Sequence, residues 1–551
     1  MTDLTFAAPL RRLTQSRPTI GQTALNLTVT LYLLAVLNTG FRHRLIEIFG
    51  DRPLSLALFL AAIAGLTLFT LELLGPGRLQ RPVAAVLILI ASGATYFEQA
   101  YGVLIDREMV RNVFETTAAE SRHLVTLGAV RSVALTGVLP ASLLFWPRVR
   151  RVQRWHLLWR WPLGIALSLA LVVGGLFADY KTFSAVLRER QDLMSSYQPG
   201  ATLTAVVRYA RQQWMASALT FRPIATDAAP GARLAAADRP ILLVLFVGET
   251  LRAQNFGLNG YARQTTPGLA AREVINFPDV SACGTSTAVS LPCMFSLQTQ
   301  ATYARDRFLA QENLLDVLVR AGFVVRWIDN NTGDQQIAAR TGWDRVDPAL
   351  DPAACAVECT DAVFLPLIEQ SLANLERNTV LVLHMIGSHG PAYHLRYPPE
   401  RAAFTPDCQS SEFARCTVDE IVNAYDNTAL QTDHVLSRTI DLLSGSTQAL
   451  TAMLFLSDHG ESLGEGGLYL HAAPMFMAPE TQTRVPMVLW TDTDFRDAMD
   501  LDESCLRAAA ARPTSHDALF HILLGLLDVR TQTRNPALDL VADCHGAGEG
   551  S

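Results

Sequence analysis

The first 180 residues alternate long apolar stretches with short polar connections. Five stretches each hold about 20 mostly apolar residues, the length that crosses a bilayer as a helix. They cover residues 23–41, 54–74, 82–104, 124–146 and 157–178. Polar side chains interrupt two of them, since Asn26 and Asn38 lie in the first and Arg131 lies near one end of the fourth. The pattern predicts an all-α bundle of five membrane-spanning helices in residues 1–180.

Arginines flank these stretches on one side of the predicted membrane. They precede the first stretch or lie between the second and third or the fourth and fifth: Arg11, Arg12, Arg17, Arg78, Arg81, Arg148, Arg150, Arg151 and Arg154. Basic residues collect on the cytoplasmic side of membrane proteins. With five spans, the loop 105–122 and everything after residue 180 would then lie outside the cytoplasm.

The pattern changes after the last span. In residues 181–222, arginines are interspersed among apolar residues, which is typical of amphipathic helices. Residues 223–240 are rich in Ala, Pro and Asp and have no periodicity, which is typical of a linker. From residue 241, continuous apolar runs (241–250, 323–329, 379–387 and 449–460) alternate with helical patterns (311–321 and 419–443). Such runs are typical of strands buried on both faces of a parallel sheet. The pattern predicts an α/β domain over residues 241–551 with helices on both faces of its sheet.

Composition separates the same two parts. The whole chain is 50% hydrophobic and only 18% charged, which argues against a wholly soluble or a disordered protein. Residues 1–180 contain 17 arginines, no lysine and 10 acidic residues, a net charge of +7. The remainder must carry −14 to give the total of −7. An acidic soluble part does not indicate nucleic-acid binding.

All eight cysteines lie in the part predicted to be outside the cytoplasm, where disulfides persist. Close spacing suggests the local pairs Cys283/Cys293, Cys355/Cys359 and Cys408/Cys416, which would leave Cys505 with Cys544. Eight cysteines allow 105 connectivities, so other pairings and buried free thiols stay open.

Potential metal ligands follow the predicted strands. Glu249 follows the first run, and Asp458 with His459 follows the last. Ligands of parallel α/β sheets bind beyond the carboxyl ends of the strands. Carboxylates with imidazole suit Zn²⁺ or a similar divalent ion, and His389 and His471 add two more imidazoles. A purely structural Asp-His pair is the alternative.

A nucleophile candidate lies in residues 279–293, where Thr285 follows Gly284 just before a predicted helix start. A helix N-terminus favours phosphate, and a metal lowers the pKa of a hydroxyl held beside it. The alternative is that Thr285 or Ser286 only caps the helix.

Five segments together resemble the membrane phosphoethanolamine transferases of Gram-negative bacteria, whose soluble domain is of the alkaline phosphatase/sulfatase type. These segments are VGETLRAQNFGLNGYARQTTP (247–267), CGTSTAVSLPCMFS (283–296), IDNNTG (328–333), HMIGSHGPAY (384–393) and SDHGESLGEGGLYLHAAP (457–474). The resemblance implies that Thr285 is the phosphorylated nucleophile and binds one tightly held zinc together with Glu249, Asp458 and His459. It implies that His389 and His471 assist substrate binding, catalysis or a second, weaker zinc.

The predicted outer loop adds a second match. Asn112, Thr116 and Glu120 are spaced by four and would share one face of a helix. The resemblance implies that they contact the phosphoethanolamine headgroup, although such a stripe is more often a solvated face. In the loop after Asp-Asn-Asn, some family members carry Ser and Lys where this chain has Thr332 and Gln335, so the positive charge is absent here.

The resemblance implies a monomeric, multi-pass enzyme of the bacterial inner membrane with its catalytic domain in the periplasm. It would move phosphoethanolamine from phosphatidylethanolamine to lipid A, release diacylglycerol and confer polymyxin resistance. Alternatives within the family are a core sugar or a periplasmic glucan as acceptor. A glycerophosphate transferase is a further alternative. A sulfatase ranks low because Cys283-Gly-Thr-Ser-Thr287 lacks the Pro and Arg of Cys/Ser-x-Pro-x-Arg. A non-enzymatic scaffold would need a broken site, and every expected position is filled.

Overall fold

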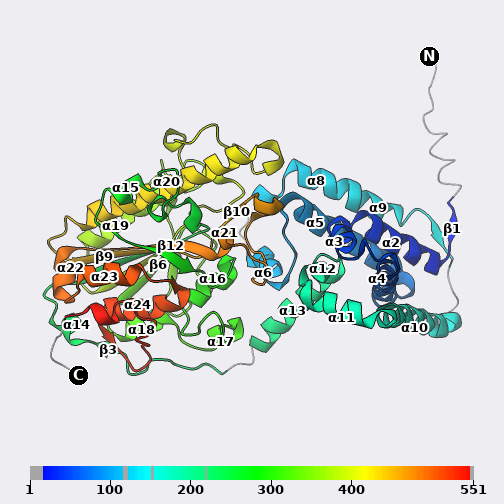
Figure 1. The fold of residues 1–551 in the computed structure, drawn as a ribbon, viewed down its shortest axis with the longest axis horizontal. Helices are drawn as coiled ribbons and strands as arrows, with labels where there is room; N and C mark the ends of the chain where they lie inside the picture. The colour runs from blue at the N-terminus through cyan, green and yellow to red at the C-terminus, as the bar shows by residue number, and fades with distance from the viewer. Residues whose placement is uncertain (1–16, 116–121, 151–153, 217–219, 547–551) are drawn as a thin grey trace, which may run out of the picture. The chain divides into compact units, whose positions relative to one another are not determined.

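The structure, a computed structural model, describes residues 17–115, 122–150, 154–216 and 220–546 (Figure 1). The chain forms two compact units. The first comprises Met1–Val110 and Val125–Arg208, and the second comprises Arg111–Leu124 and Tyr209–Ser551. Two of the boundaries between them fall inside helices α6 (Arg107–Glu115) and α13 (Gly200–Ala216), and the third lies between Leu124 and Val125.

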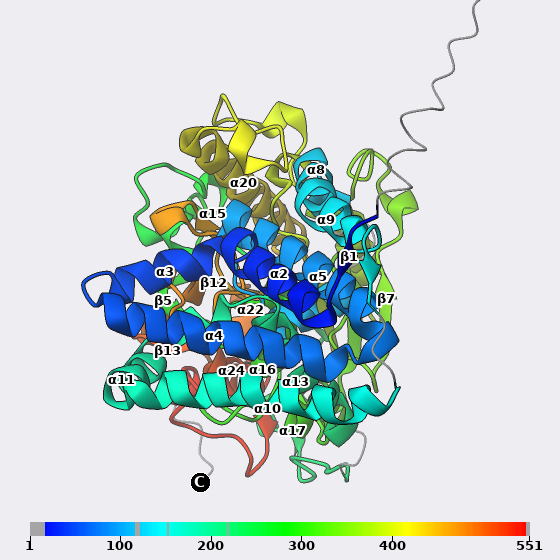
Figure 2. The same ribbon diagram turned by 90° about the vertical axis from the view of Figure 1, so that its right-hand side faces the viewer.

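The first unit is helical, apart from the strand pair β1 (Thr19–Ile20) and β2 (Arg148–Val149). Figure 2 shows α4 and α10 side by side, and these two helices share an extensive contact. The helices of this unit are α2 (Gln22–Val36), α3 (Thr39–Phe49), α4 (Pro53–Leu74), α5 (Gln80–Tyr101), α8 (Leu127–Val133), α9 (Leu139–Leu143), α10 (Arg154–Ala178), α11 (Tyr180–Glu189) and α12 (Gln191–Ser195).

The described residues do not confirm five separate spans. Three helical stretches are long and apolar enough to cross a membrane: Pro53–Leu74, Gly77–Tyr101 and Leu158–Ala178. A fourth span is possible if α2 and α3 count together, although they bend by 73°. The stretch predicted over 124–146 forms a shorter apolar helix, Leu127–Leu143, with a π-helical turn at Ala134–Val138.

Asn38 explains why the first apolar stretch is not one straight helix. Its side-chain amide donates to the carbonyl oxygens of Leu33 (2.9 Å) and Gln198 (2.8 Å), and its Oδ1 accepts from the Gln198 N–H (2.7 Å). Asn38 is 1% exposed. A buried amide needs such partners, so the chain turns where the side chain reaches them.

The second unit is built on an eight-stranded sheet in the order β13-β5-β12-β9-β4-β8-β6-β7. The predicted apolar runs form its centre as β4 (Ile241–Gly248), β9 (Leu450–Ser457), β8 (Thr379–His384) and β6 (Val324–Asp329), all mutually parallel. The other strands are β5 (Ile275–Ser281), β7 (Trp343–Arg345), β12 (Arg484–Thr491) and β13 (Thr514–Ser515). The α/β prediction is confirmed, but the sheet is mixed because β12 runs antiparallel to both β5 and β9.

Helices cover both faces of this sheet (Figure 1). Alternate residues of β4 divide between two cores, as the period of two in a strand requires: Leu243 and Leu245 pack with α18 and α24, and Val244 and Phe246 pack with α19 and α20. The helices are α14 (Ala232–Ala236), α15 (Pro267–Ala270), α16 (Thr287–Met294), α17 (Arg305–Leu309), α18 (Leu314–Arg320), α19 (Phe364–Ala373), α20 (Val418–Leu443), α21 (Glu480–Thr483), α22 (Thr493–Ala498), α23 (Glu503–Ala510) and α24 (Leu519–Leu526).

Two strand pairs lie outside the main sheet: β3 (Ala229–Pro230) with β14 (Val529–Arg530), and β10 (Ser462–Leu463) with β11 (Tyr469–Leu470). The segment 223–240, predicted as a linker, contains β3 and α14. Its Leu234 is 5% exposed and belongs to the hydrophobic core. This segment is therefore packed on the domain.

All eight cysteines are paired, and the pairs are those that the spacing suggests. The bonds join Cys283–Cys293, Cys355–Cys359, Cys408–Cys416 and Cys505–Cys544. Each closes a loop within the second unit, the part predicted to lie in an oxidising compartment.

Candidate active site

Three potential metal ligands meet where two neighbouring parallel strands end. Gly248 at the end of β4 pairs with Ser457 at the end of β9, and the next residues are Glu249 and Asp458. Glu249, Asp458 and His459 each offer a ligand atom, and these atoms lie within 4.8 Å of one another. All three side chains are fully buried. The fold therefore brings together the three ligands expected from the sequence.

Hydrogen bonds orient His459 and Asp458 toward this common point. His459 Nδ1 lies 2.9 Å from the Gly460 carbonyl oxygen, which assigns the proton to Nδ1 and leaves a lone pair on Nε2. That Nε2 is 3.4 Å from Asp458 Oδ2. Asp458 Oδ1 accepts from the N–H groups of Thr250 and His459, whereas Oδ2 is buried without a hydrogen-bond partner among the described residues. A divalent cation fits these two inward-facing atoms.

Burial shifts the protonation of both groups in the absence of a cation. It raises the pKa of Asp458 to about 6 and lowers the pKa of His459 well below its ordinary value. In both cases the low-dielectric surroundings disfavour the charged form. The neutral imidazole is the form that binds metals.

The sequence analysis missed two residues that contact Glu249. Asn331, just after β6, donates from Nδ2 to Glu249 Oε2 (2.7 Å) and to the Met385 carbonyl oxygen (2.9 Å). The Thr287 hydroxyl, at the start of α16, lies 3.1 Å from both carboxylate oxygens of Glu249. Their positions in the sequence could have identified them. Asn331 follows a buried strand, and Thr287 begins a helix in the segment 283–296 that resembles the family.

Thr285 lies in the loop between β5 and α16 and is 6% exposed. Its Oγ1 donates to the Ala473 carbonyl oxygen (2.7 Å), and its own carbonyl oxygen accepts from the Ala472 N–H (2.7 Å). Ser286 occupies the N-cap position of α16, but its side chain makes no capping hydrogen bond. The structure thus ties the Thr285 loop to the segment around His471.

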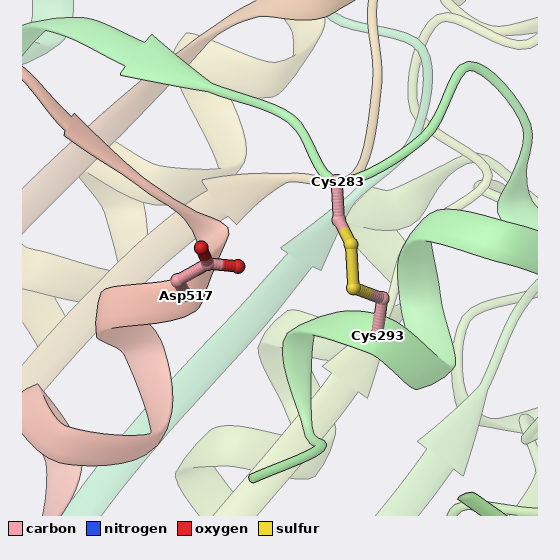
Figure 3. Close-up of side chains that lie close together, drawn as sticks. All are labelled: Cys283, Cys293 and Asp517. Atoms are coloured by element: carbon pink, nitrogen blue, oxygen red, sulfur yellow. A yellow bond between two sulfur atoms is a disulfide. The ribbon is translucent and has the colours of Figure 1, made fainter. Parts of the chain in front are cut away.

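A second cluster, Cys283, Cys293 and Asp517, also has the spacing of a metal site. Figure 3 shows the two sulfur atoms bonded to each other beside the Asp517 carboxylate. Disulfide sulfurs are not thiolate ligands, so this cluster does not provide a cysteine metal site. The disulfide instead joins Cys283 to Cys293 of α16, so that Thr285 lies inside the loop that it closes.

His389 and His471 lie beside the three ligands. The His471 ring centroid is 4.6 Å from that of His459 and 5.4 Å from that of His389. His471 Nδ1 lies 3.4 Å from Glu461 Oε2. The fold therefore places His471 next to the ligand His459, and His389 next to His471.

The structure describes three of the five other residues predicted to bind substrate. Thr332 directly follows Asn331, and its Oγ1, like Oε1 of Gln335, is buried without a hydrogen-bond partner among the described residues. Asn112 lies on α6. Thr116 and Glu120 lie outside the described residues.

The loop closed by Cys355–Cys359 connects to His389 through an ion-pair chain within the second unit. Glu358 Oε1 lies 2.6 Å from His123 Nε2, and Glu358 Oε2 lies 2.6 Å from Arg396 Nη1. Arg396 Nε donates to the His389 carbonyl oxygen (3.0 Å). Glu358 thus anchors the guanidinium that holds the backbone at His389.

We expect Glu358 to stabilise the folded chain above pH 4.5. The hydrogen bond with His123, reinforced by the charge of Arg396, lowers the pKa of Glu358 from 4.5 to about 2. Because the folded-state pKa lies below the unfolded one, this stabilisation is present above pH 4.5 and is lost as the pH falls toward 2. Glu358→Gln should lower the free energy of unfolding by about 1–3 kcal/mol at pH 6.

Denaturant unfolding of both proteins in detergent at several pH values measures this difference, which should shrink as the pH falls below 4.5. Glu503→Gln is the control, since it removes a solvent-accessible i,i+4 pair with Arg507 and a 3.4 Å contact with Arg496, and should change stability by less than about 1 kcal/mol. A Glu358→Gln effect that is independent of pH between 6 and 3 would contradict the assignment.

Two family models match the chain. One, described as phosphoethanolamine transferase EptA/EptB, matches residues 63–214, and the other, described as sulfatase, matches residues 242–529.

Three known proteins resemble nearly the whole chain. Phosphoethanolamine transferase EptA of Escherichia coli (strain K12) is 38% identical over 479 residues, 86% of this chain and 87% of that protein. Phosphatidylethanolamine transferase Mcr-2 of Escherichia coli is 32% identical over 526 residues, 91% of this chain and 94% of that protein. The solved integral membrane lipooligosaccharide phosphoethanolamine transferase A (EptA) from Neisseria meningitidis superposes with a TM-score of 0.91 at 34% identity, covering 96% of this chain and 100% of that one.

Proposed function

Because the chain belongs to the phosphoethanolamine transferase family, with a soluble part of the alkaline phosphatase/sulfatase superfamily, we propose that it transfers phosphoethanolamine from phosphatidylethanolamine to a lipid A phosphate. The observation that carries this proposal is the buried group of Glu249, Asp458 and His459 in the same domain as the Thr285 loop. The similarity to an integral membrane transferase and the apolar helices make it a multi-pass protein of the bacterial inner membrane, with its catalytic domain in the periplasm.

We propose zinc as the metal, held by Glu249, Asp458 and His459, with Thr285 as a fourth ligand. Two carboxylates and a neutral imidazole are a set that Zn²⁺ favours. The partnerless Asp458 Oδ2 and the lone pair that His459 Nε2 directs toward it, 3.4 Å away, support this choice. When bound, the ion would supply Lewis-acid stabilisation of negative charge on the phosphoryl oxygens. His389 and His471 would suit a second, weaker zinc.

Thr285 is the proposed nucleophile. In the first step its Oγ1 forms a bond to the donor phosphorus while the bond from phosphorus to the glycerol oxygen breaks. The Thr285 proton passes to a base, and diacylglycerol leaves after its oxygen gains a proton. In the second step an oxygen of the lipid A phosphate forms a bond to the same phosphorus, the bond between that phosphorus and Thr285 Oγ1 breaks, and Oγ1 takes back a proton from the base. His389 and His471 are the candidates for moving these protons.

The headgroup contacts belong to the same proposal. The buried, partnerless Thr332 hydroxyl would donate a hydrogen bond to a phosphate oxygen of phosphoethanolamine, and the partnerless Oε1 of Gln335 would accept one from its ammonium group. Asn112, together with Thr116 and Glu120, would contact the same group from the segment after the third predicted span. Gln335 brings an amide where some relatives carry a lysine, so this chain would hold the phosphate there without a formal charge.

The domain arrangement is also a proposal. Residues 1–180 would form five spans and 181–222 the amphipathic connection, and the periplasmic catalytic domain of a monomer would comprise 241–551 together with the packed segment 223–240. Placing both units at one membrane suits substrates with an acyl part and a polar head. The added ammonium would make lipid A less negative, and cationic peptides bind anionic surfaces with about 1 kcal/mol per basic residue. The expected phenotype is resistance to polymyxins.

Mass spectrometry tests the proposal in two steps. The purified chain incubated with phosphatidylethanolamine should gain the mass of one phosphoethanolamine and release one equivalent of diacylglycerol. In cells that express it, lipid A phosphates should carry phosphoethanolamine. Absence of the protein adduct and of diacylglycerol would refute the donor assignment. An adduct on a core sugar or a periplasmic glucan, with lipid A unchanged, would replace only the acceptor.

A further inference from the structure

An exposed apolar loop lies close in sequence to the candidate nucleophile's partners. We define the apolar loop as residues 474–479, between β11 and α21. Met475, Phe476 and Met477 are 45%, 54% and 41% exposed. Among the described residues of the second unit, they form the only run of three consecutive exposed large hydrophobic side chains. Single exposed hydrophobic residues are ordinary, but a contiguous group often marks a contact surface.

The apolar loop starts from a fixed base. Ala472 and Ala473 are tied to Thr285 by two hydrogen bonds of 2.7 Å. The fully buried Gln482, on the other side of the loop, accepts from the Ala473 N–H (3.0 Å) and donates to the Leu470 carbonyl oxygen (3.0 Å). The base of the loop is therefore held in place at the nucleophile, while the three large side chains extend into solvent.

The backbone at this base is costly to maintain. Leu470 and Ala472, on either side of His471, have φ values of 63° and 67°, a region that residues with a Cβ rarely occupy. Such strain persists only where the surroundings enforce it, and it concentrates at functional positions. Here the enforcing contacts are those from Thr285 and Gln482. The hydrogen bonds with Thr285 and Gln482 therefore fix the backbone conformation from which the apolar loop begins.

Charge is excluded from the whole neighbouring sequence. Between Glu465 and Glu480, no residue is Asp, Glu, Lys or Arg. Longer charge-free stretches occur elsewhere in the second part, such as 280–304 and 378–395, but here the stretch includes the three exposed side chains of residues 475–477. A charged side chain pressed against acyl chains is unfavourable, whereas Phe and Met are favourable there. The composition fits contact with a lipid surface.

We propose that the apolar loop contacts the acyl region of the phospholipid donor at the bilayer surface and thereby positions the donor phosphodiester beside Thr285. This inference rests on the proposed function, because it takes the donor to be a lipid. The scissile phosphodiester of such a lipid lies directly next to its glycerol and acyl chains. A group fixed beside the attacking oxygen is therefore close to where the acyl part begins. The occupant that this geometry favours is the lipid substrate.

Lipid contact and catalysis can be measured separately in the full-length protein by comparing a substrate that has acyl chains with one that has none. The triple variant Met475→Ser/Phe476→Ser/Met477→Ser should raise the KM for phosphatidylethanolamine in vesicles by about tenfold or more, since it removes three interfacial hydrophobic side chains. Its kcat/KM for p-nitrophenyl phosphoethanolamine, which has no acyl chains, should stay within about twofold of the unmodified protein. The variant Met475→Leu/Met477→Leu should retain a normal KM for the lipid.

The matched control is Val319→Ser/Val418→Ser, which removes two exposed hydrophobic side chains elsewhere on the domain. It should leave both substrates unaffected. Equal losses on the lipid and on the chromogenic substrate would overturn the inference, because the loop would then shape the catalytic site or the fold. A triple variant with an unchanged KM for the lipid would overturn it as well.

A readout without turnover distinguishes this inference from the proposed function. Vesicles that contain phosphatidylethanolamine with a photoreactive diazirine in one acyl chain should cross-link to Met475, Phe476 or Met477 of the unmodified protein. Labelling of the membrane helices alone would overturn lipid contact by the apolar loop. If the unmodified protein cross-links at the apolar loop but shows no transfer activity, lipid contact by the loop is supported and the proposed function is refuted.

Discussion

The Asp458→Asn protein should lose most of its zinc and reduce transfer by about 10³-fold or more. Asparagine keeps the size of the side chain but removes the negative charge that faces Glu249 and His459. The carboxylate oxygen at stake is Oδ2, which is buried without a partner among the described residues. Bound zinc measured by elemental analysis, together with diacylglycerol release, checks this prediction.

Asp433→Asn is a closely matched control. Asp433 is also a buried aspartate that accepts two backbone N–H groups, here those of Gly268 and Leu269. Both of its oxygens are occupied by these bonds. The control should therefore lower stability by about 1–3 kcal/mol while zinc and turnover per folded molecule stay normal. If Asp458→Asn keeps its zinc, or if Asp433→Asn loses it to the same extent, the metal assignment is wrong.

The Thr285→Ala protein should form no phosphoethanolamine adduct and should lose transfer by about 10³-fold or more. It should retain zinc, because Glu249, Asp458 and His459 remain. It should also lose about 1 kcal/mol of stability, since the Ala473 carbonyl oxygen loses its donor. Intact-mass measurement after incubation with phosphatidylethanolamine detects the adduct, and thermal unfolding in detergent reports the stability.

Neighbouring hydroxyls provide the controls for this prediction. Thr285→Ser keeps a hydroxyl and should restore part of the adduct formation. Ser286→Ala should form the adduct normally, because that side chain makes no capping bond at α16. Thr287 is the stronger competitor, since its hydroxyl lies 3.1 Å from Glu249. An adduct that persists in Thr285→Ala and maps to Thr287 would reassign the nucleophile.

Much of the soluble domain follows from patterns that are local in sequence. The continuous apolar runs become central strands because a strand covered on both faces needs hydrophobic residues at every position. Since parallel strands end at a common edge, Glu249, Asp458 and His459 could be expected together before any coordinates. The acidic, cysteine-containing half could be separated from the arginine-flanked half by composition alone.

Contacts between distant segments escape this reasoning. The bend near Asn38 depends on Gln198, which is 160 positions away, so an apolar stretch of the right length does not predict one straight helix. The antiparallel β12 has the same hydrophobic pattern that a parallel strand would have. Its direction is set by how the chain returns to the sheet.

The sequence by itself determined a membrane-associated first part, an α/β second part and the types of residue at the candidate site. It could not determine that Asn331 and Thr287 contact Glu249, or that Thr285 is joined to Ala472 and Ala473. These hydrogen bonds are directional and link segments up to 188 positions apart. Hydrophobic periodicity records only which side of an element is buried, whereas the tertiary structure decides which polar atoms meet there.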